Sequence, residues 1–339
     1  GHDGAIYTMR DAAGASSAAL GSLNRSSVIC IAVPEKTFSP SSGVASSMVE
    51  VTMSSMPIST CKAASLPNIA GWVGADTVGV LLSTGIYAET EPALAIDIGT
   101  NTEMCLSHGG KMSSLSCASG PAFEGAHIKF GMRAAPGAIE RVQIVDGRAE
   151  YKTIGDERPV GMCGSGLLDV VAQLRLAEVL NDKGRLGGPQ VREADGDREY
   201  VIAPETEAGN GRAITVTQQD IRELQLAKGA IRCGIDTLLQ DAGIAAGDLD
   251  EVTIAGAFGT YIDVQSAQVI GLLPQVPPDR VSQVGNAAGT GARLALISRD
   301  KRRAALEIAA KDGYIELATI PDFNEKIAAA TSMVWQGGR

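Results

Sequence analysis

A short polar turn between two apolar stretches is the part of this sequence best suited to chemistry. Residues 97–100, Asp-Ile-Gly-Thr, interrupt an apolar run that extends from residue 93 to residue 106. This pattern predicts a strand, a tight turn and a second strand. A glycine in the turn lets the backbone approach a ligand closely, and the amides and hydroxyls that follow can donate to phosphate oxygens. The candidate phosphate ligands are Gly99, Thr100, Asn101 and Thr102.

Asp97 is the acidic residue of this turn, and its carboxylate is placed to hold Mg²⁺ through water. A Walker loop would need Gly-Lys-Ser/Thr at its end, and a dinucleotide fingerprint would continue from a strand into a helix. Here a second strand is expected instead, so the pattern favours a phosphate-binding hairpin. A surface hairpin without any ligand can carry the same four residues, and that alternative stays open.

A second glycine turn stands before an apolar helical stripe. Residues 161–166 contain three glycines, and leucines and valines recur at helical spacing over residues 167–174. The amides of Gly164, Ser165 and Gly166 would then lie at a helix N-terminus, where partial positive charge favours an anion. A tight helix start with no ligand is the alternative interpretation.

Two further segments run from an apolar strand into glycines, at residues 251–260 and 281–292. Glycines at the carboxyl end of a strand allow a flat ligand to lie against the backbone, at the sheet edge where α/β proteins usually bind ligands. Each turn alone is an ordinary loop. Taken together with the acidic hairpin, they predict one nucleotide cleft.

The longest predicted helix covers residues 217–241. Thr217 and Asp220 have the spacing of a capping box, and apolar residues follow at core spacing. Lys228 lies off that apolar stripe, near Gln225. A solvated lysine is the default expectation, and near a nucleotide Lys228 would become a candidate for base or ribose contact.

Composition limits the class of protein. The 339 residues are 45% hydrophobic and 20% charged, enough for one or two buried cores. The net charge of −10 argues against nucleic acid as a partner. No apolar run reaches the roughly 18 residues that a membrane span needs. The six cysteines form no Cys-x-x-Cys pair, which predicts buried thiols in a reducing cytoplasm and no iron–sulfur cluster within the chain.

Other elements follow from the same patterns. We expect short strands around the Asp146-Gly147 turn, and a loop at residues 117–125 that leads into a helix. The acidic, glycine-bearing stretch 192–211 is expected to be an exposed excursion. The remainder alternates between helix and strand, as in a sheet with packed helices. Further expected elements are a strand at 26–33, a serine-rich loop at 39–47, a helix ending at Leu82, a third strand at 111–115, and surface histidines at His2, His108 and His127.

The motifs, taken in their order, resemble the actin-like ATPase superfamily. Within it, they are similar to the ATP-dependent reductive activators of corrinoid proteins, over about residues 64–335. The segments that carry the resemblance are residues 66–76, 97–103, 118–125, 161–169, 217–230, 255–263 and 285–292.

This resemblance implies an α/β, actin-like (RNase H-like) fold with mixed sheets flanked by helices and two lobes around a nucleotide cleft. It divides the chain into a partial N-terminal lobe, 1–92, and a C-terminal lobe, 93–339. The family carries a second Asp-x-Gly-Thr-Thr hairpin and cluster-binding cysteines that this sequence does not supply. We therefore expect the chain to be a C-terminal fragment, with a [2Fe-2S] cluster only in a missing upstream domain.

The resemblance also implies residue roles. Asp97 and Glu124 are the catalytic candidates, and Asp97 assists Mg²⁺ through water. Gln225 and Lys228 face the nucleoside, while residues 256–259 wall the base. The full set of candidate nucleotide-binding residues is Asp97, Gly99, Thr100, Asn101, Thr102, Gly164, Ser165, Gly166, Gln225, Lys228, Gly256, Ala257, Phe258, Gly259, Gly285 and Asn286.

The implied activity is the use of ATP to return an oxidised Co(II) corrinoid protein to the Co(I) state needed for methyl transfer. The implied partners are ATP and a corrinoid protein, and the sequence leaves open whether the protein forms a homodimer. Two other hypotheses remain. One is a small-molecule phosphotransferase of the acetate or sugar kinase type, with Asp76 or Glu124 as general base. The other is a nucleotide-sensing scaffold without turnover.

Overall fold

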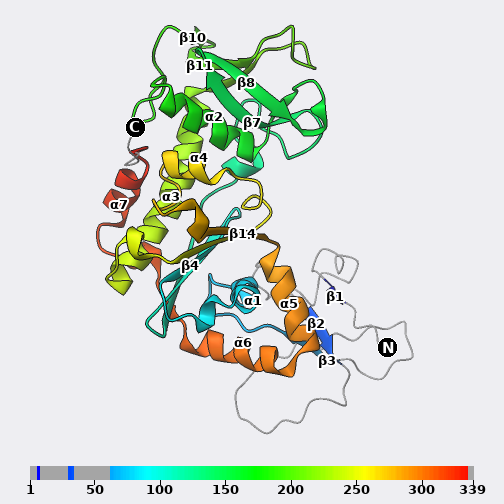
Figure 1. Cartoon of the computed structure of the whole chain (residues 1–339), viewed down its shortest axis with the longest axis vertical. Coiled ribbons are helices and arrows are strands. Elements are labelled where there is room, and N and C mark those ends of the chain that lie inside the picture. Colours follow the sequence, from blue (N-terminus) through cyan, green and yellow to red (C-terminus); the bar gives the residue numbers. More distant parts are fainter. Residues whose placement is uncertain (1–5, 8–29, 34–61, 335–339) are drawn as a thin grey trace, which may run out of the picture. The chain divides into compact units, whose positions relative to one another are not determined.

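A computed structural model describes residues 6–7, 30–33 and 62–334 (Figure 1). Several expected features fall outside these residues: the first part of the strand at 26–33, the serine-rich loop at 39–47, and His2. The second part of the expected strand at 26–33 is present as strand β2 (Cys30–Val33).

A six-stranded mixed sheet contains the predicted hairpin. Its strands are β4 (Ala93–Asp97), β5 (Thr102–His108), β6 (Lys111–Cys117), β13 (Glu251–Ala255), β14 (Val281–Gly285) and β15 (Gly313–Tyr314). The strand order is β14-β13-β4-β5-β6-β15, with β13 parallel to β14 and β15 parallel to β6. The first four residues of β4 are buried, as expected for an apolar strand in the middle of a sheet. The strand–turn–strand prediction for residues 93–106 is therefore confirmed.

The chain forms two compact units that interleave in sequence. Among the described residues, the first unit takes 105–115 and 286–315 together with the residues up to 95. The second takes 96–104, 116–285 and 316–334. Strands β4, β5 and β6 contribute residues to both. These interleaved units are defined by packing and do not correspond to a single boundary in the sequence. The division into two family lobes at residue 92 therefore stays a prediction.

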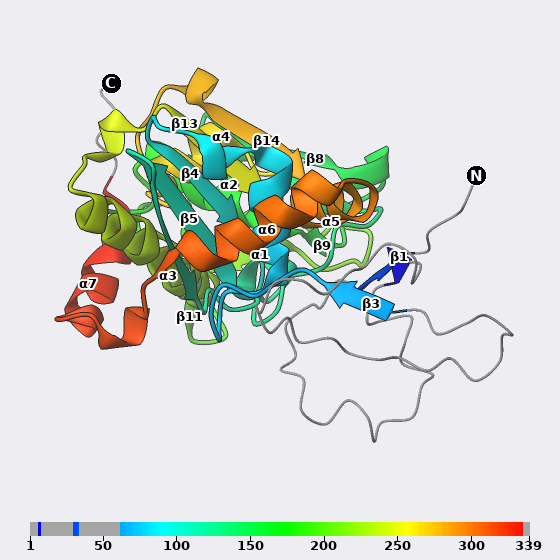
Figure 2. The same ribbon diagram turned by 90° about the horizontal axis from the view of Figure 1, so that it is seen from below.

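The first unit is built on three helices, α1 (Ala75–Thr84), α5 (Ala287–Ile297) and α6 (Arg299–Lys311), which lie together in Figure 2. Strands β1 (Ile6–Tyr7), β2 and β3 (Lys62–Ser65) form an antiparallel sheet. Helices α1 and α5 meet backbone to backbone. A Cβ placed on Gly291 would lie 1.8 Å from the carbonyl oxygen of Gly79, so only glycine fits there.

The second unit contains two small sheets and four helices. One sheet has the order β8 (Arg148–Thr153), β7 (Ala138–Val145), β9 (Gly161–Met162), and the other β10 (Val191–Ala194), β11 (Asp197–Ala203), β12 (Ile214–Thr217). The helices are α2 (Gly164–Leu176), α3 (Gln218–Ala242), α4 (Val264–Val269) and α7 (Phe323–Ala330), and α7 packs along α3 (Figure 1).

Helix α3 forms as predicted. The Thr217 hydroxyl accepts a hydrogen bond from Asp220 N, and the Asp220 carboxylate accepts one from Thr217 N, which completes the capping box. Gly243, with φ 68°, ends the helix in the left-handed conformation that glycine adopts most easily. The apolar stripe of α3, including Ile221, Leu224 and Leu238, is fully buried. Within the described part of the chain, no helix is long and apolar enough to cross a membrane.

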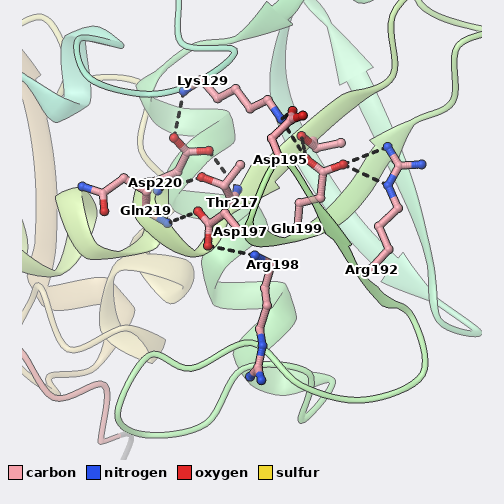
Figure 3. A network of polar contacts seen from close by, with 10 residues as sticks. Lys129, Arg192, Asp195, Asp197, Arg198, Glu199, Thr217, Gln219 and Asp220 are labelled. Carbon is pink, nitrogen blue, oxygen red and sulfur yellow. Dashed lines mark hydrogen bonds and ion pairs between the residues drawn. The ribbon is translucent and has the colours of Figure 1, made fainter.

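The prediction of an exposed excursion at 192–211 holds only for its second part. Half of these residues form strands β10 and β11, and residues 204–213 form a largely exposed loop before β12. The reason is charge compensation. Glu199, with its side chain 3% exposed, forms ion pairs with Lys129 at 2.9 Å and Arg192 at 2.8 Å, and the Thr215 hydroxyl donates to it (Figure 3). These contacts hold the pKa of Glu199 below its usual value although burial opposes them.

Two smaller expectations also change. The segment 117–125 contains a single 3₁₀ turn at residues 122–124, which Gly125, with φ 83°, ends. The α-helix expected after this segment does not form. His108 is half-buried, whereas His127 is exposed as expected. Burial of the thiols is confirmed for the four cysteines whose side chains are described, Cys105, Cys117, Cys163 and Cys233.

The contact between α1 and α5 predicts a sharp sensitivity to one methyl group. We expect Gly291→Ala to lower the free energy of unfolding by about 3 kcal/mol, because the new Cβ would overlap the Gly79 carbonyl. Gly247→Ala is the control, since its Cβ would meet nothing within 4 Å, and it should change stability by less than about 1 kcal/mol. Urea unfolding of both variants measures this. Equal stabilities would contradict the described packing.

The buried glutamate makes a second prediction. Glu199→Gln should lower the free energy of unfolding by about 2 kcal/mol at neutral pH, because hydrogen bonds to a charged group are lost. The pKa of Glu199 is lowered in the fold, so its stabilisation is present above the ordinary glutamate pKa and disappears on acidification. The gap between variant and wild type should therefore close at low pH. Glu193→Gln, at a side chain 81% exposed, should show neither effect in the same denaturation series.

Candidate functional site

The turn that joins β4 to β5 is held from behind by the segment after β6. The Ser119 hydroxyl donates to the carbonyl oxygen of Gly99 at 2.9 Å, and Gly120 N donates to the carbonyl oxygen of Thr100 at 2.9 Å. Oγ of Ser119 also lies 2.8 Å from Oγ1 of Thr102. These bonds fix the shape of the turn. We did not single out Ser119 from the sequence, although it lies in the motif at 118–125.

The predicted phosphate ligands divide into two groups. Gly99, Thr100 and Asn101 are exposed. Thr102 is fully buried, and its hydroxyl is engaged with Ser119. The Thr100 hydroxyl donates to Oε1 of Glu124, an exposed carboxylate, so the structure brings this second catalytic candidate to the turn.

The corner after β13 lies against the same turn. Ile98 N donates to the carbonyl oxygen of Ala255 at 3.3 Å. A Cβ on Gly256 would lie 2.6 Å from the carbonyl oxygen of Ile98 and 2.9 Å from Oδ1 of Asp97. Gly256 also has φ 91°, which side chains disfavour, so glycine is required here twice over. The 97–102 turn and the 255–259 corner therefore lie side by side, as predicted.

Strand β14 ends at this corner as well. Gly256 N donates to the carbonyl oxygen of Gly285 at 3.0 Å, because the parallel register of β13 and β14 shifts to pair Ala255 with Gly285. Asn286, the next residue, caps helix α5: its side chain accepts from Gly289 N at 2.8 Å. The structure thus gives Asn286 a capping role, and its contact with a nucleotide stays a prediction.

The start of α2 packs against two aromatic rings. Phe123 and Phe258 stack with ring centroids 4.5 Å apart. A Cβ on Gly164 would lie 2.1 Å from the Phe123 carbonyl oxygen and 2.9 Å from the Phe258 ring. A Cβ on Gly166 would lie 2.2 Å from the carbonyl oxygen of Ile139, and Ser165 is buried beside Cys163. Close packing accounts for these glycines, and their role in anion binding stays a prediction.

Two corner residues differ in exposure. Ala257 is exposed, whereas Gly259 is buried. A Cβ added at Gly259 would lie 2.4 Å from the carbonyl oxygen of Ala255. The Thr260 hydroxyl donates to the Gly256 carbonyl at 3.2 Å and tightens the turn. Ala257 and Phe258 are therefore the members of this segment that present side-chain surface.

Gln225 and Lys228 have partners in the C-terminal segment. Gln225 Nε2 donates to the Thr331 carbonyl at 3.1 Å, and Lys228 Nζ donates to that of Ser332. Lys228 is 1% exposed, so the default expectation of a solvated lysine is wrong. It lines a cavity of about 380 Å³ between α3 and α7, and burial lowers its pKa to about 8. Contact of Gln225 and Lys228 with a nucleoside stays a prediction.

A cation held through water at Asp97 stays a prediction. Asp97 is half-buried at the end of β4, beside Gly256. Among the described residues, no group of three or more histidine, cysteine or acidic side chains could hold a metal ion. A Mg²⁺ ion at Asp97 would therefore take most of its ligands from water and from phosphate oxygens. This is the way Mg²⁺ is usually bound with nucleotides.

Comparisons with known proteins assign the chain to a family. Residues 91–338 match a family model described as the C-terminal domain of RACo, the ASKHA domain. The chain is 40% identical over 271 residues to the corrinoid activation enzyme RamQ of Eubacterium limosum, covering 77% of this chain and 45% of that protein. It is 28% identical over 304 residues to the [Co(II) methylated amine-specific corrinoid protein] reductase of Methanosarcina barkeri, covering 83% and 53%.

A solved structure is similar over the same region. The reductive activator for corrinoid, iron-sulfur protein is 41% identical, with a TM-score of 0.72, and covers 79% of this chain and 44% of that one. The chain thus spans about half the length of the curated relatives that it matches. The fold expected from the motifs is confirmed. This chain belongs to the family of C-terminal ASKHA domains of RACo, with an actin-like α/β architecture of mixed sheets flanked by helices.

Proposed function

We propose that this chain is the ATP-binding module of a reductive activator that drives a Co(II) corrinoid protein to the Co(I) state for methyl transfer. The observation that carries the proposal is the approach of Gly256 to the Ile98 carbonyl and the Asp97 carboxylate. It joins two glycine turns, far apart in sequence, around one acidic residue. The relatives named above as corrinoid activators and reductases support the choice of reaction.

The exposed part of the turn would bind the phosphates. Gly99, Thr100 and Asn101 lie on a backbone already fixed by Ser119 and Gly120, so little conformational freedom remains to be lost on binding. Successive backbone amides in such a turn favour an anion. Asp97 would hold Mg²⁺ through water beside the phosphates, and the cation would offset the negative charges of both.

Glu124 would act as general base. It already accepts a hydrogen bond from the Thr100 hydroxyl, which places a carboxylate at the phosphate turn. In hydrolysis, Glu124 would take a proton from the water that attacks the γ-phosphorus, while the bond from phosphorus to the ADP oxygen breaks. The hydroxyl of Thr100 would then turn from Glu124 to a phosphate oxygen.

The corner after β13 would receive the base. Residues 256–259 offer a glycine backbone next to the exposed Ala257 and to Phe258, whose ring rests on Phe123. Gly285 lies behind Gly256 and supports it. Gln225 and Lys228 would reach the nucleoside only after releasing the carbonyls of Thr331 and Ser332. The amides of residues 164–166 would act on phosphate through the α2 N-terminus.

ATP would act on the cobalt centre through conformation. Reduction of Co(II) to Co(I) takes one electron, which an iron–sulfur domain outside this chain would supply. ATP can favour the reducible state of the partner only by binding one conformation of the activator more tightly than another. The net charge of −10 would favour a partner surface of complementary charge in the cytoplasm.

Nucleotide binding has a direct test in Asp97. We expect Asp97→Asn to weaken binding of ATP in the presence of Mg²⁺ at least about tenfold, measured by isothermal titration calorimetry, because the carboxylate that orders the cation is lost. Asp146→Asn is the matched control. It makes the same change at an exposed hairpin position with φ 50°, which asparagine also tolerates, so affinity should not change. Equal affinities for the two variants would contradict the proposed site.

The reaction has a separate test. In the presence of a chemical reductant, we expect ATP hydrolysis by a protein that contains this chain to rise when its Co(II) corrinoid protein is added. Co(I), followed by its absorption spectrum, should form only when ATP is present. Hydrolysis that ignores the corrinoid protein would count against the activator. ATP binding without phosphate release would favour a nucleotide-sensing scaffold, and a phosphorylated small acid or sugar would favour a phosphotransferase.

A further inference from the structure

A polar cavity lies in the second unit, lined by different residues from the candidate nucleotide site. Its volume is about 430 Å³, and β7, β8, α2 and the start of α4 surround it. These elements lie together in Figure 1. The cavity lies beside the later part of α2, at Asp169, Gln173 and Leu176, whereas Gly164–Gly166 begin that helix. Neither the 97–102 turn nor the 255–259 corner contributes to its lining.

Asp169 has a buried carboxylate oxygen that a ligand could hydrogen-bond. It is 4% exposed and lines the cavity, and its Oδ1 has no hydrogen-bond partner among the described residues. Its Oδ2 lies 3.6 Å from Nη1 of Arg141, whose side chain is 44% exposed. A buried carboxylate oxygen without a donor is costly. A ligand that brings a positive charge or a hydrogen-bond donor to this carboxylate would remove that cost.

The other charges around the cavity divide by depth. Arg141 and Lys152 are the cations, and both are substantially exposed, at 44% and 67% of their side chains. Asp263 is half-buried and already engaged, because it caps α4 by accepting from Ser266 N at 2.8 Å. Glu150 and Tyr151 complete the titratable lining, and the Tyr151 hydroxyl donates to Glu207. Asp169 is therefore the buried charge of the cavity, while Arg141, Lys152 and the exposed Glu150 lie where it opens. Lys152 Nζ also lies 3.6 Å from Oε1 of Glu140.

We propose that this cavity binds a small zwitterion, an amino acid or a close analogue, with its ammonium group at Asp169 and its carboxylate at Arg141 and Lys152. The ligand's ammonium would donate hydrogen bonds to the carboxylate of Asp169. The ligand's carboxylate would accept hydrogen bonds from the guanidinium of Arg141, which offers several donors. The volume suits a molecule of a few heavy atoms with bound water. This site is independent of nucleotide binding, so either proposal can fail without the other.

The test uses three zwitterions of increasing length: glycine, β-alanine and 4-aminobutanoate. Calorimetric titration into the whole chain should show binding of at least one, and acetate and ethylammonium, each with half of the required charges, should bind at least about tenfold more weakly. Asp169→Asn should weaken the best zwitterion at least about tenfold. Asp279→Asn, at an exposed carboxylate outside the cavity, should leave its affinity unchanged.

The affinity of the wild type at low pH tests the role of the Asp169 carboxylate without a substitution. It therefore remains informative if the Asp169→Asn variant fails to fold. Burial, helped by the nearby Asp263, raises the pKa of Asp169 to about 6, against the opposing effects of Arg141 and of hydrogen bonding by Ser266 and the Val142 backbone. One unit below that pKa, nine-tenths of the carboxyl is protonated, so affinity for the ammonium should fall about tenfold between pH 7.5 and pH 5. Failure of all three zwitterions to bind, or affinity that is the same at both pH values, would overturn the proposal.

Discussion

The candidate site depends on one backbone contact, the approach of Gly256 to the end of β4. Two chain segments more than 150 residues apart meet there without a side chain between them, so the carbonyl of Ile98 and the carboxylate of Asp97 lie against a bare α-carbon. The hydrogen bonds from Ile98 N to Ala255 and from Gly256 N to Gly285 hold the three strand ends in register. Every exposed donor of the turn owes its position to this arrangement, because β4 carries the turn and β13 carries the corner.

Much of this was readable in the sequence because local rules and tertiary structure agree. The capping box at Thr217 and Asp220 and the hairpin at Asp146-Gly147 satisfy their hydrogen bonds within their own segments, and strand β4 pairs on one side with β5, the next strand in the chain. A pattern of that kind gives the same answer in any fold. The meeting of residues 97–98 with 255–256 could be expected only because glycine turns at strand ends gather at one edge of a sheet.

The misses have a common physical origin in buried charge. Residues 192–203 look like a loop because they are acidic, yet Glu199 is buried where Arg192 of the neighbouring strand and the sequence-distant Lys129 form ion pairs with it (Figure 3). Lys228 looks like a solvated lysine, yet it is buried with a carbonyl from residue 332 as its acceptor. In both cases a compensating group, Lys129 or the Ser332 carbonyl, is distant in sequence, and no local pattern predicts it. Ser119 was missed for the same reason, since its partners are carbonyls of another turn.

The contact between Gly79 and Gly291 has a mechanical consequence for the first unit. Where two helices touch through their backbones, no side chain can rotate to take up a displacement. We therefore expect α1 and α5 to move as one stiff body in any motion of that unit. Deformation of the unit would then be confined to the connections around this pair.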